Sequence, residues 1–102
     1  MAQFDLFRHA RNTRYPFLLD VQADLLRDLA TRVVAPLTAV KRLRGSPISR
    51  LNPIVEVEGA GYAVLFQEMA AVPVSALGAS AGHLRARRAE LIAALDLLFT
   101  GI

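Results

Sequence analysis

The sequence predicts one domain of the α+β class, mainly β, in which strands over residues 1–78 precede a C-terminal helix at about residues 80–100. Apolar and polar residues alternate in several short runs over the first part of the chain, which is the pattern of half-buried strands. Glycine and proline separate these runs, and after Gly78 the apolar spacing becomes that of a helix. Because 102 residues give room for a single core, we treat residues 1–102 as one domain.

Three strands are expected in the first part of the chain. In residues 3–6 and 16–22 every second side chain is apolar, and a basic loop over residues 8–14 joins these two runs. Residues 31–37 are rich in β-branched side chains, which favour strands. Pro36 lacks a backbone N–H, so it predicts that this third strand ends there or lies at a sheet edge.

A loop and then a hairpin are expected next. Residues 41–52 contain a glycine, a proline and four basic residues, which is typical of an irregular excursion. Residues 54–58 and 62–67 flank the glycine-bearing residues 59–61, an arrangement that predicts a β-hairpin. A last short strand, limited by proline, is expected at residues 72–74.

The C-terminal helix carries the most informative pattern. Ser80 is the expected N-cap, and Gly101 is the expected left-handed residue that ends the helix. Beyond Glu90 the only charge is Asp96, so apolar side chains cover nearly the whole circumference of the last turns. The main apolar stripe consists of Leu84, Leu91, Leu95, Leu98 and Ile102.

A helix that is apolar all round needs cover on more than one side. The strands can cover one side, and no later segment of this sequence can cover the other, so we expect a second protein surface there. A sister subunit alone would satisfy the pattern, as would a sister subunit together with a foreign partner that grips the helix end. The hydrophobic content of 54% in so small a chain also favours a permanent apolar interface.

Charge and cysteine content limit the possible classes of function. The net charge is +3, and eleven of the twelve basic residues are arginine, which suits a nucleic acid, an acidic protein or no partner at all. The absence of cysteine excludes disulfide scaffolds, thiolate zinc sites and cysteine nucleophiles. No signal peptide is visible, and the apolar runs are shorter than a membrane helix, so we expect a cytoplasmic protein without membrane contact.

No pattern marks a catalytic or metal site. His9 and His83 are far apart in the chain, without the serine–acid arrangement of a triad or further ligands for a metal. The glycines of residues 59–61 lack the lysine of a phosphate loop. The carboxylates expected to be solvated are Asp20, Asp24, Asp28, Glu56 and Glu58. We therefore expect no catalytic residue, no metal and no cofactor.

Two basic loops could form one positively charged surface. Their basic residues are Arg8, Arg11 and Arg14 in the first loop and Lys41, Arg42, Arg44 and Arg50 in the second. Aromatic residues make up only 7% of the chain, which disfavours base stacking along a nucleic-acid strand. An acidic partner segment, or simple solvation, is the favoured interpretation.

Four motifs, in this order along the chain, identify a family resemblance. They are residues 20–26 (DVQADLL), 32–37 (RVVAPL), 69–74 (MAAVPV) and 99–102 (FTGI). Together they are specific, and from end to end the chain resembles the CcdB family, the toxins of ccd toxin–antitoxin modules that poison DNA gyrase. The resemblance implies an SH3-like barrel of antiparallel strands with a small extra sheet and a long C-terminal α-helix, assembled as a homodimer.

The resemblance also implies partners. Members of the family bind the dimerisation domain of the gyrase A subunit, trap the cleaved gyrase–DNA complex and are neutralised by a CcdA-like antitoxin, which alone contacts operator DNA. The implied gyrase-binding residues are Leu25, Leu26, Asp96, Phe99, Thr100, Gly101 and Ile102. The suggested antitoxin-binding residues are Arg8, Arg11, Arg14, Lys41, Arg42 and Arg44. The best-known members carry tryptophan at the position of Thr100 and an amide at that of Asp96.

Two alternatives stay open. MazF/Kid-like toxins use a similar barrel to cleave messenger RNA, and His9 with Asp20 and the loop arginines could supply such a site. The second alternative is a non-toxic relative that only binds antitoxin, and it is suggested by threonine at position 100 in place of the tryptophan of the best-known members.

Overall fold

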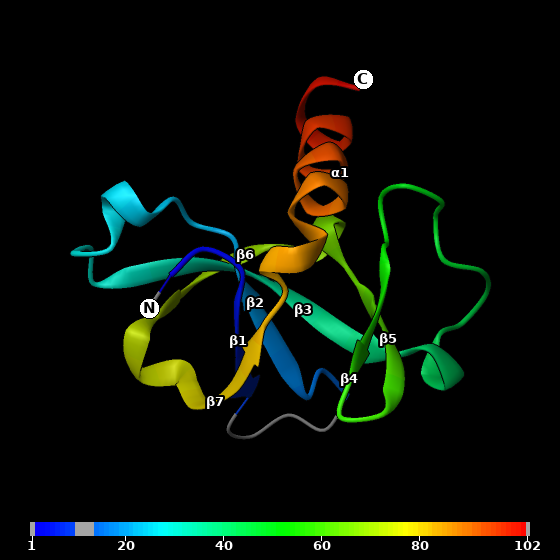
Figure 1. Cartoon of the computed structure of the whole chain (residues 1–102), viewed down its shortest axis with the longest axis horizontal. Helices are drawn as coiled ribbons and strands as arrows, with labels where there is room; N and C mark the ends of the chain where they lie inside the picture. Colours follow the sequence, from blue (N-terminus) through cyan, green and yellow to red (C-terminus); the bar gives the residue numbers. More distant parts are fainter. Residues whose placement is uncertain (1, 10–13, 102) are drawn as a thin grey trace.

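The computed structural model describes residues 2–9 and 14–101, and its strands form one curled antiparallel sheet that carries a single α-helix (Figure 1). The strand order is β4-β5-β3-β2-β1-β7, and β6 also pairs with β3. The sheet curls into a half-barrel, and the helix α1 projects from it with its C-terminal end outermost. The predicted fold class, α+β and mainly β, is confirmed.

Each of the six expected strands overlaps an observed one. The strands are β1 (Asp5–His9), β2 (Phe17–Asp20), β3 (Thr31–Ala39), β4 (Ile54–Val57), β5 (Ala60–Val64), β6 (Ala70–Pro73) and β7 (Leu77–His83). The helix α1 covers Arg88–Thr100, and the 3₁₀ turns are η1 (Asp24–Leu26), η2 (Val40–Arg42), η3 (Phe66–Glu68), η4 (Val74–Ala76) and η5 (Arg85–Arg87). All described strands share one hydrogen-bonded sheet, so the small extra sheet implied by the resemblance is continuous with the rest.

The strand β3 lies in the middle of the sheet although it contains Pro36. On one side β3 pairs with β2, where Leu18 lies opposite Pro36. On the other side the pairing with β6 ends at Val34 and the pairing with β5 begins at Leu37, so Pro36 falls in the gap between two neighbours. The expectation that the strand ends at Pro36 or lies at a sheet edge is wrong on both counts, because β3 continues to Ala39 and has neighbours on both sides. Its physical reason holds, because the missing N–H lies where no partner strand requires it.

The β4–β5 hairpin turns through two residues, and these begin one position earlier than expected. Val57 pairs with Ala60, which leaves Glu58 and Gly59 as the turn. Their φ angles are 53° and 82°, and a tight hairpin turn of this kind needs positive φ at both positions. Gly59 adopts such a φ without strain because it has no Cβ.

The core lies between the curled sheet and the base of α1. Leu91 and Ala94 of the helix are fully buried against Phe66 of η3 and the apolar side chains of the strands. Burial of one such large side chain stabilises the fold by roughly 1.5–3 kcal/mol. The strand residues of this cluster are Leu6, Phe17, Leu19, Ala35, Leu37, Val55, Val57 and Val64.

The structure corrects the expected start of the helix. Residues 77–83 form β7 instead, and Ser80 pairs with Phe7 of β1 rather than capping a helix. Leu84 follows this strand, and its N–H donates to the carbonyl oxygen of Phe4 at 2.8 Å. The first leucine of the apolar stripe therefore precedes α1, which begins only at Arg88.

Gly78 allows β7 to approach β1 closely. A Cβ at this position would lie 2.6 Å from the carbonyl oxygen of Arg8, which is closer than real Cβ atoms come. We expect Gly78→Ala to lower the free energy of unfolding by about 1–3 kcal/mol, the usual cost of overpacking, and urea denaturation measures this. Gly61→Ala is the matched control, because its Cβ would make only ordinary contacts with Val40 and Ile54. An equal loss in both variants would contradict the explanation.

Candidate functional site

The last turn of α1 extends beyond the core (Figure 1). Leu91 and Ala94 near the base are fully buried, whereas Phe99 is 70% exposed. Gly101 has a φ of 76°, and its N–H donates to the carbonyl oxygen of Leu97 at 3.0 Å. The helix therefore ends at the expected glycine, with a large apolar side chain in solvent one turn above the core.

Asp96 and Thr100 accompany Phe99 on this end of the helix. The Thr100 hydroxyl donates to the backbone carbonyl oxygen of Asp96 at 2.7 Å, so this bond does not use the Asp96 carboxylate. Both residues are exposed. We call Asp96, Phe99, Thr100 and Gly101 the helix tip; Ile102, the last residue expected to bind gyrase, lies outside the described residues.

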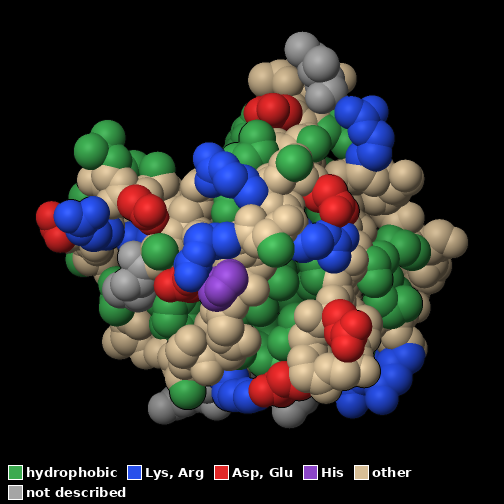
Figure 2. Space-filling model, in the orientation of Figure 1, with side chains coloured by type: hydrophobic (Ala, Val, Ile, Leu, Met, Phe, Trp, Pro, Cys, Tyr) green, Lys and Arg blue, Asp and Glu red, His purple; other side chains and the backbone are tan. Residues whose placement is uncertain are grey.

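A second apolar surface lies on the loop between β2 and β3. Leu25 is 91% exposed and Leu26 is 46% exposed, and Leu29 of the same loop is also exposed. Figure 2 shows hydrophobic side chains gathered over this loop. We call these three leucines the loop patch. In Figure 1 the loop between β2 and β3 and the C-terminal end of α1 project on the same side of the sheet, apart from each other.

A buried ion pair is connected by hydrogen bonds to the loop that carries the loop patch. Asp20 and Arg32 are completely buried, and Nε and Nη2 of Arg32 donate to Oδ2 of Asp20 at 2.9 and 2.5 Å. The other carboxylate oxygen accepts the N–H of Gln22 at 3.0 Å. The Gln22 side chain in turn donates to the carbonyl oxygen of Leu26 at 2.8 Å. The ion pair is thus connected through one glutamine to an exposed residue of the loop patch.

The position of Asp20 corrects the expectation that it is solvated. Burial raises the pKa of Asp20, and the hydrogen bonds from Arg32 and from the Gln22 amide oppose this rise. Nη1 of Arg32 is buried and has no hydrogen-bond partner within residues 2–9 and 14–101. The other four carboxylates, Asp24, Asp28, Glu56 and Glu58, are exposed as expected.

Gln3 links the loop to the base of α1. Its backbone N–H donates to Oδ1 of Asp24 at 2.6 Å, and its side-chain oxygen accepts a hydrogen bond from Nη1 of Arg88 at 2.9 Å. The Arg88 guanidinium also lies over the ring of Phe4, 5.7 Å from its centre. These contacts hold the loop patch and the helix base in a defined relative position.

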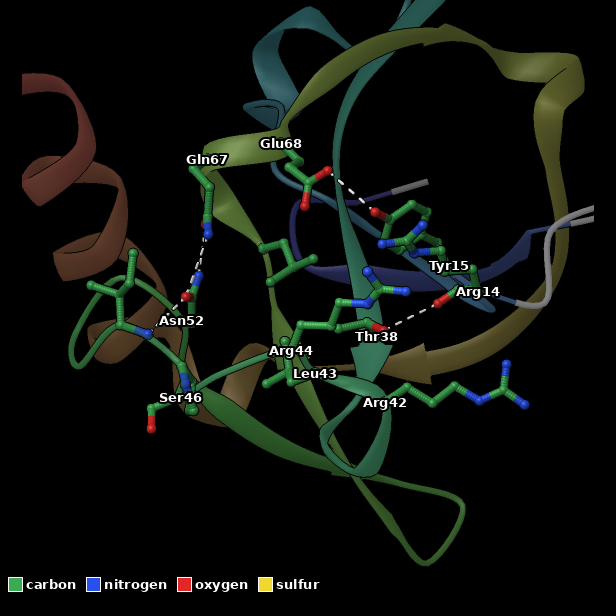
Figure 3. A pocket seen from close by; sticks show the side chains of 13 residues that line it. Arg14, Tyr15, Thr38, Arg42, Leu43, Arg44, Ser46, Asn52, Gln67 and Glu68 are labelled. Atoms are coloured by element: carbon green, nitrogen blue, oxygen red, sulfur yellow. Dashed lines mark hydrogen bonds between the residues drawn. The ribbon is translucent and has the colours of Figure 1, made fainter.

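The two basic loops meet at a pocket of about 300 Å³ (Figure 3). Arg14 lies just before β2, whereas Arg42 and Arg44 belong to the segment after β3. Tyr15 and Glu68 also line this pocket, and their hydroxyl and carboxylate groups are 3.3 Å apart. The structure therefore brings Arg14, Arg42 and Arg44 together, and we call this site the basic pocket.

The other residues suggested for antitoxin binding lie outside the lining of the basic pocket. Arg8 forms an ion pair with Glu58, and its guanidinium lies 5.4 Å from the centre of the Phe17 ring. Lys41 is exposed in η2. Arg11 lies outside the described residues.

The histidines do not assemble a reactive site with the described acids. His9 lies at one end of β1, beside Pro16, whereas Asp20 lies at the far end of β2 and is bound by Arg32. His83 is exposed. Over the described residues no three potential metal ligands cluster, and no helix has the length and apolar character needed to cross a membrane.

Sequence reasoning missed several residues of this site, among them Gln22, Leu29 and Gln3. Gln22 could have been found, because a glutamine within an apolar strand segment indicates a buried amide that needs partners. Leu29 directly follows the charged residues Arg27 and Asp28, which is a weak indication of an exposed side chain. Gln3 had no local indication, because its partners Asp24 and Arg88 are distant in the sequence.

Two solved structures have a similar fold. One is an endoribonuclease in complex with its cognate antitoxin from a mycobacterial species, with a TM-score of 0.73 and 17% identity over 94% of this chain and 91% of that chain. The other is the Mycobacterium tuberculosis toxin MazF-mt6, with a TM-score of 0.67 and 22% identity over 94% of this chain and 95% of that chain. At these identities the likeness establishes the fold alone.

The sequence itself matches a family model. The model is described as CcdB protein, and the match covers residues 3–101. It includes the loop patch, the buried ion pair and the whole helix tip. Because it spans nearly the entire chain, this protein belongs to the CcdB family.

Proposed function

We propose that the protein is the toxin of a type II toxin–antitoxin system and that it binds the dimerisation domain of the gyrase A subunit, trapping the cleaved gyrase–DNA complex. The family assignment supports a toxin of a toxin–antitoxin system. The observation that carries the finer proposal is Phe99, which is 70% exposed at the end of a helix whose base is buried in the core. Large aromatic side chains at such positions are the usual anchors of protein interfaces.

The proposed toxin acts as a wedge, without chemistry of its own. DNA cleavage belongs to gyrase, and the toxin prevents resealing by occupying the open gate. The helix tip and the loop patch supply the contact, with Asp96 as a polar anchor beside Phe99. A homodimer with two-fold symmetry would present both surfaces twice, which suits a target that is itself dimeric.

The antitoxin belongs to the proposal as a second partner. A CcdA-like antitoxin would place an acidic, disordered segment on the basic loops, and Arg14, Arg42 and Arg44 form their shared surface. One structure with a similar fold was solved together with its antitoxin, which supports a partner of this kind. Operator DNA would be contacted by the antitoxin, and the complex would act in the cytoplasm.

A gyrase assay tests the proposed contact. Purified protein, gyrase and supercoiled plasmid are incubated, and linear DNA is measured after detergent and protease treatment. Leu25→Ser/Leu26→Ser is expected to reduce linear DNA by at least about tenfold, because two apolar contacts are lost. Both side chains are exposed, so the fold should be retained.

Val40→Ser is the control, because Val40 is an exposed aliphatic residue of η2 that belongs to neither the loop patch nor the lining of the basic pocket. It should leave the yield of linear DNA unchanged. If the wild type yields no linear DNA with any gyrase, the toxin is not a gyrase poison. If both variants lose activity equally, the loop patch is not the contact.

A further inference from the structure

We infer that the basic pocket binds one nucleotide of a single-stranded nucleic acid, with its phosphate on the arginines and its base within the pocket. No residue of α1 or of the loop patch lines this pocket, so the inference stands apart from the gyrase contact. Figure 3 shows Arg14, Tyr15 and Glu68 on one side of it and Ser46 and Asn52 on the opposite side.

The charge of the lining indicates an anionic ligand. Arg14, Arg42 and Arg44 provide three guanidinium groups, against the single carboxylate of Glu68. Arg42 and Arg44 form no ion pair with any described residue, so their donors are available to a ligand. All three cations are arginines, whose planar fork of N–H groups matches two oxygens of a phosphate.

The polar groups of the pocket suit a nucleobase. The Nδ2 of Asn52 donates to Oε1 of Gln67 at 2.7 Å and to the carbonyl oxygen of Val64 at 3.1 Å, which holds this pair of amides in place. The Thr38 hydroxyl donates to the carbonyl oxygen of Arg14 at 3.2 Å. The exposed partner of the amide pair, Gln67, is thereby oriented, and its amide keeps an N–H that can meet the hydrogen-bonding edge of a base turned out of its strand.

An aromatic ring and an apolar floor complete the site. Tyr15 lies at the wall, and the Arg14 guanidinium is 5.6 Å from the centre of its ring. Leu43, Ile48 and Leu65 add apolar surface. Aromatic rings and arginine planes are the surfaces on which single-stranded bases stack, at about 1–3 kcal/mol per base.

Glu68 distinguishes a nucleotide from an acidic peptide. Its carboxylate lies within the lining and would repel any anion close to it, so the phosphate belongs on the arginines and an uncharged group belongs beside Glu68. The same oxygens can accept hydrogen bonds from the amino group of a base such as cytosine. The observations therefore favour a nucleotide in the pocket itself, and an antitoxin segment on the surrounding loops would compete with it.

Fluorescence anisotropy tests this inference on the intact wild-type protein. The probes are labelled single strands of about seven nucleotides, one of RNA and one of DNA, at about 50 mM salt. We expect binding of at least one strand, and the stronger of the two identifies the source of the nucleotide. Arg42→Ala/Arg44→Ala should weaken binding by at least about tenfold and lower the salt slope by about two charges.

Arg27→Ala is the matched control, because it removes an exposed arginine of the loop after β2 and does not touch the pocket. It should change the affinity less than about twofold. Two results would overturn the inference: neither strand binds, or Arg27→Ala weakens binding as much as the double variant. If both strands fail and a labelled polyglutamate peptide binds through Arg42 and Arg44, the ligand is an acidic segment instead. Leu25→Ser/Leu26→Ser should keep strand binding, so failure of the gyrase proposal is recognised separately. If the protein cleaves RNA and Arg42→Ala/Arg44→Ala abolishes the cleavage, the result would support nucleotide binding in the basic pocket. It would contradict the proposal that the toxin has no catalytic activity of its own.

Discussion

Gly101→Glu is expected to abolish the capture of gyrase by this protein while leaving its fold intact. Gly101 lies at the end of α1, and among the described residues no side chain lies within 4 Å of the place where its Cβ would be, apart from its neighbours in the chain. A glutamate there puts a charge and a long side chain into the proposed apolar contact, which must then be desolvated on binding. The loss of a hot-spot contact of about 2–4 kcal/mol corresponds to a 30- to 1,000-fold weaker affinity.

The measurement is the affinity for the gyrase A dimerisation domain, together with the yield of linear DNA. Gly101→Ala is the matched control, because it has the same unfavourable positive φ of 76° without the charge. It should retain most of the affinity, because it adds no charge to the contact. The local backbone cost of about 1–2 kcal/mol is common to both variants, so it cannot explain a difference between them. Removal of residues 100–102 should match Gly101→Glu. If that truncation leaves capture intact, the helix tip is not the gyrase-binding site.

Arg32→Met is expected to lower the free energy of unfolding by about 3–5 kcal/mol at about pH 7, because it leaves Asp20 buried without a counter-charge. The loss should depend on pH. Arg32 opposes the rise that burial causes in the pKa of Asp20, so the pKa rises further in the variant. Folded variant protein then keeps a proton that the unfolded chain releases. The free energy of unfolding of the variant therefore falls, by up to about 1.4 kcal/mol per pH unit, as the pH rises from the ordinary pKa of aspartate to the raised pKa of Asp20 in the folded variant.

Urea denaturation at about pH 4 and about pH 7 measures this difference. We expect a smaller loss in acid, because the unfolded chain is then close to the ordinary aspartate pKa and releases only part of the proton that the folded variant keeps. The double variant Asp20→Leu/Arg32→Met should recover most of the stability at pH 7, because it leaves no buried charge. An equal loss at both pH values would show that Arg32 contributes through packing rather than charge.

The strands could be predicted because their indications are local. Alternation placed β1, β2 and β4, and Gly101 marked the end of α1 from its place after an apolar run. The exposure of Phe99 could be predicted because a helix that is apolar all round cannot be covered by its own sheet alone.

What was missed depends on contacts between distant residues. Residues 77–83 are small and polar enough to suit a loop or a helix start, and only pairing with β1 makes them a strand. Asp20 resembles a solvated carboxylate until β3 brings Arg32 against it. The basic pocket unites segments on either side of β3 with η3, an arrangement that no local spacing reveals.

The helix α1 has a buried base and an exposed end, and this difference affects which of its residues can change without loss of the fold. Leu91 and Ala94 anchor the helix, while Phe99 and Thr100 make few contacts that folding requires. Substitutions at the outermost turn therefore carry little risk of misfolding. Under the proposed function, exchanges at exposed positions such as Thr100 could therefore alter the affinity for the target while the fold is kept.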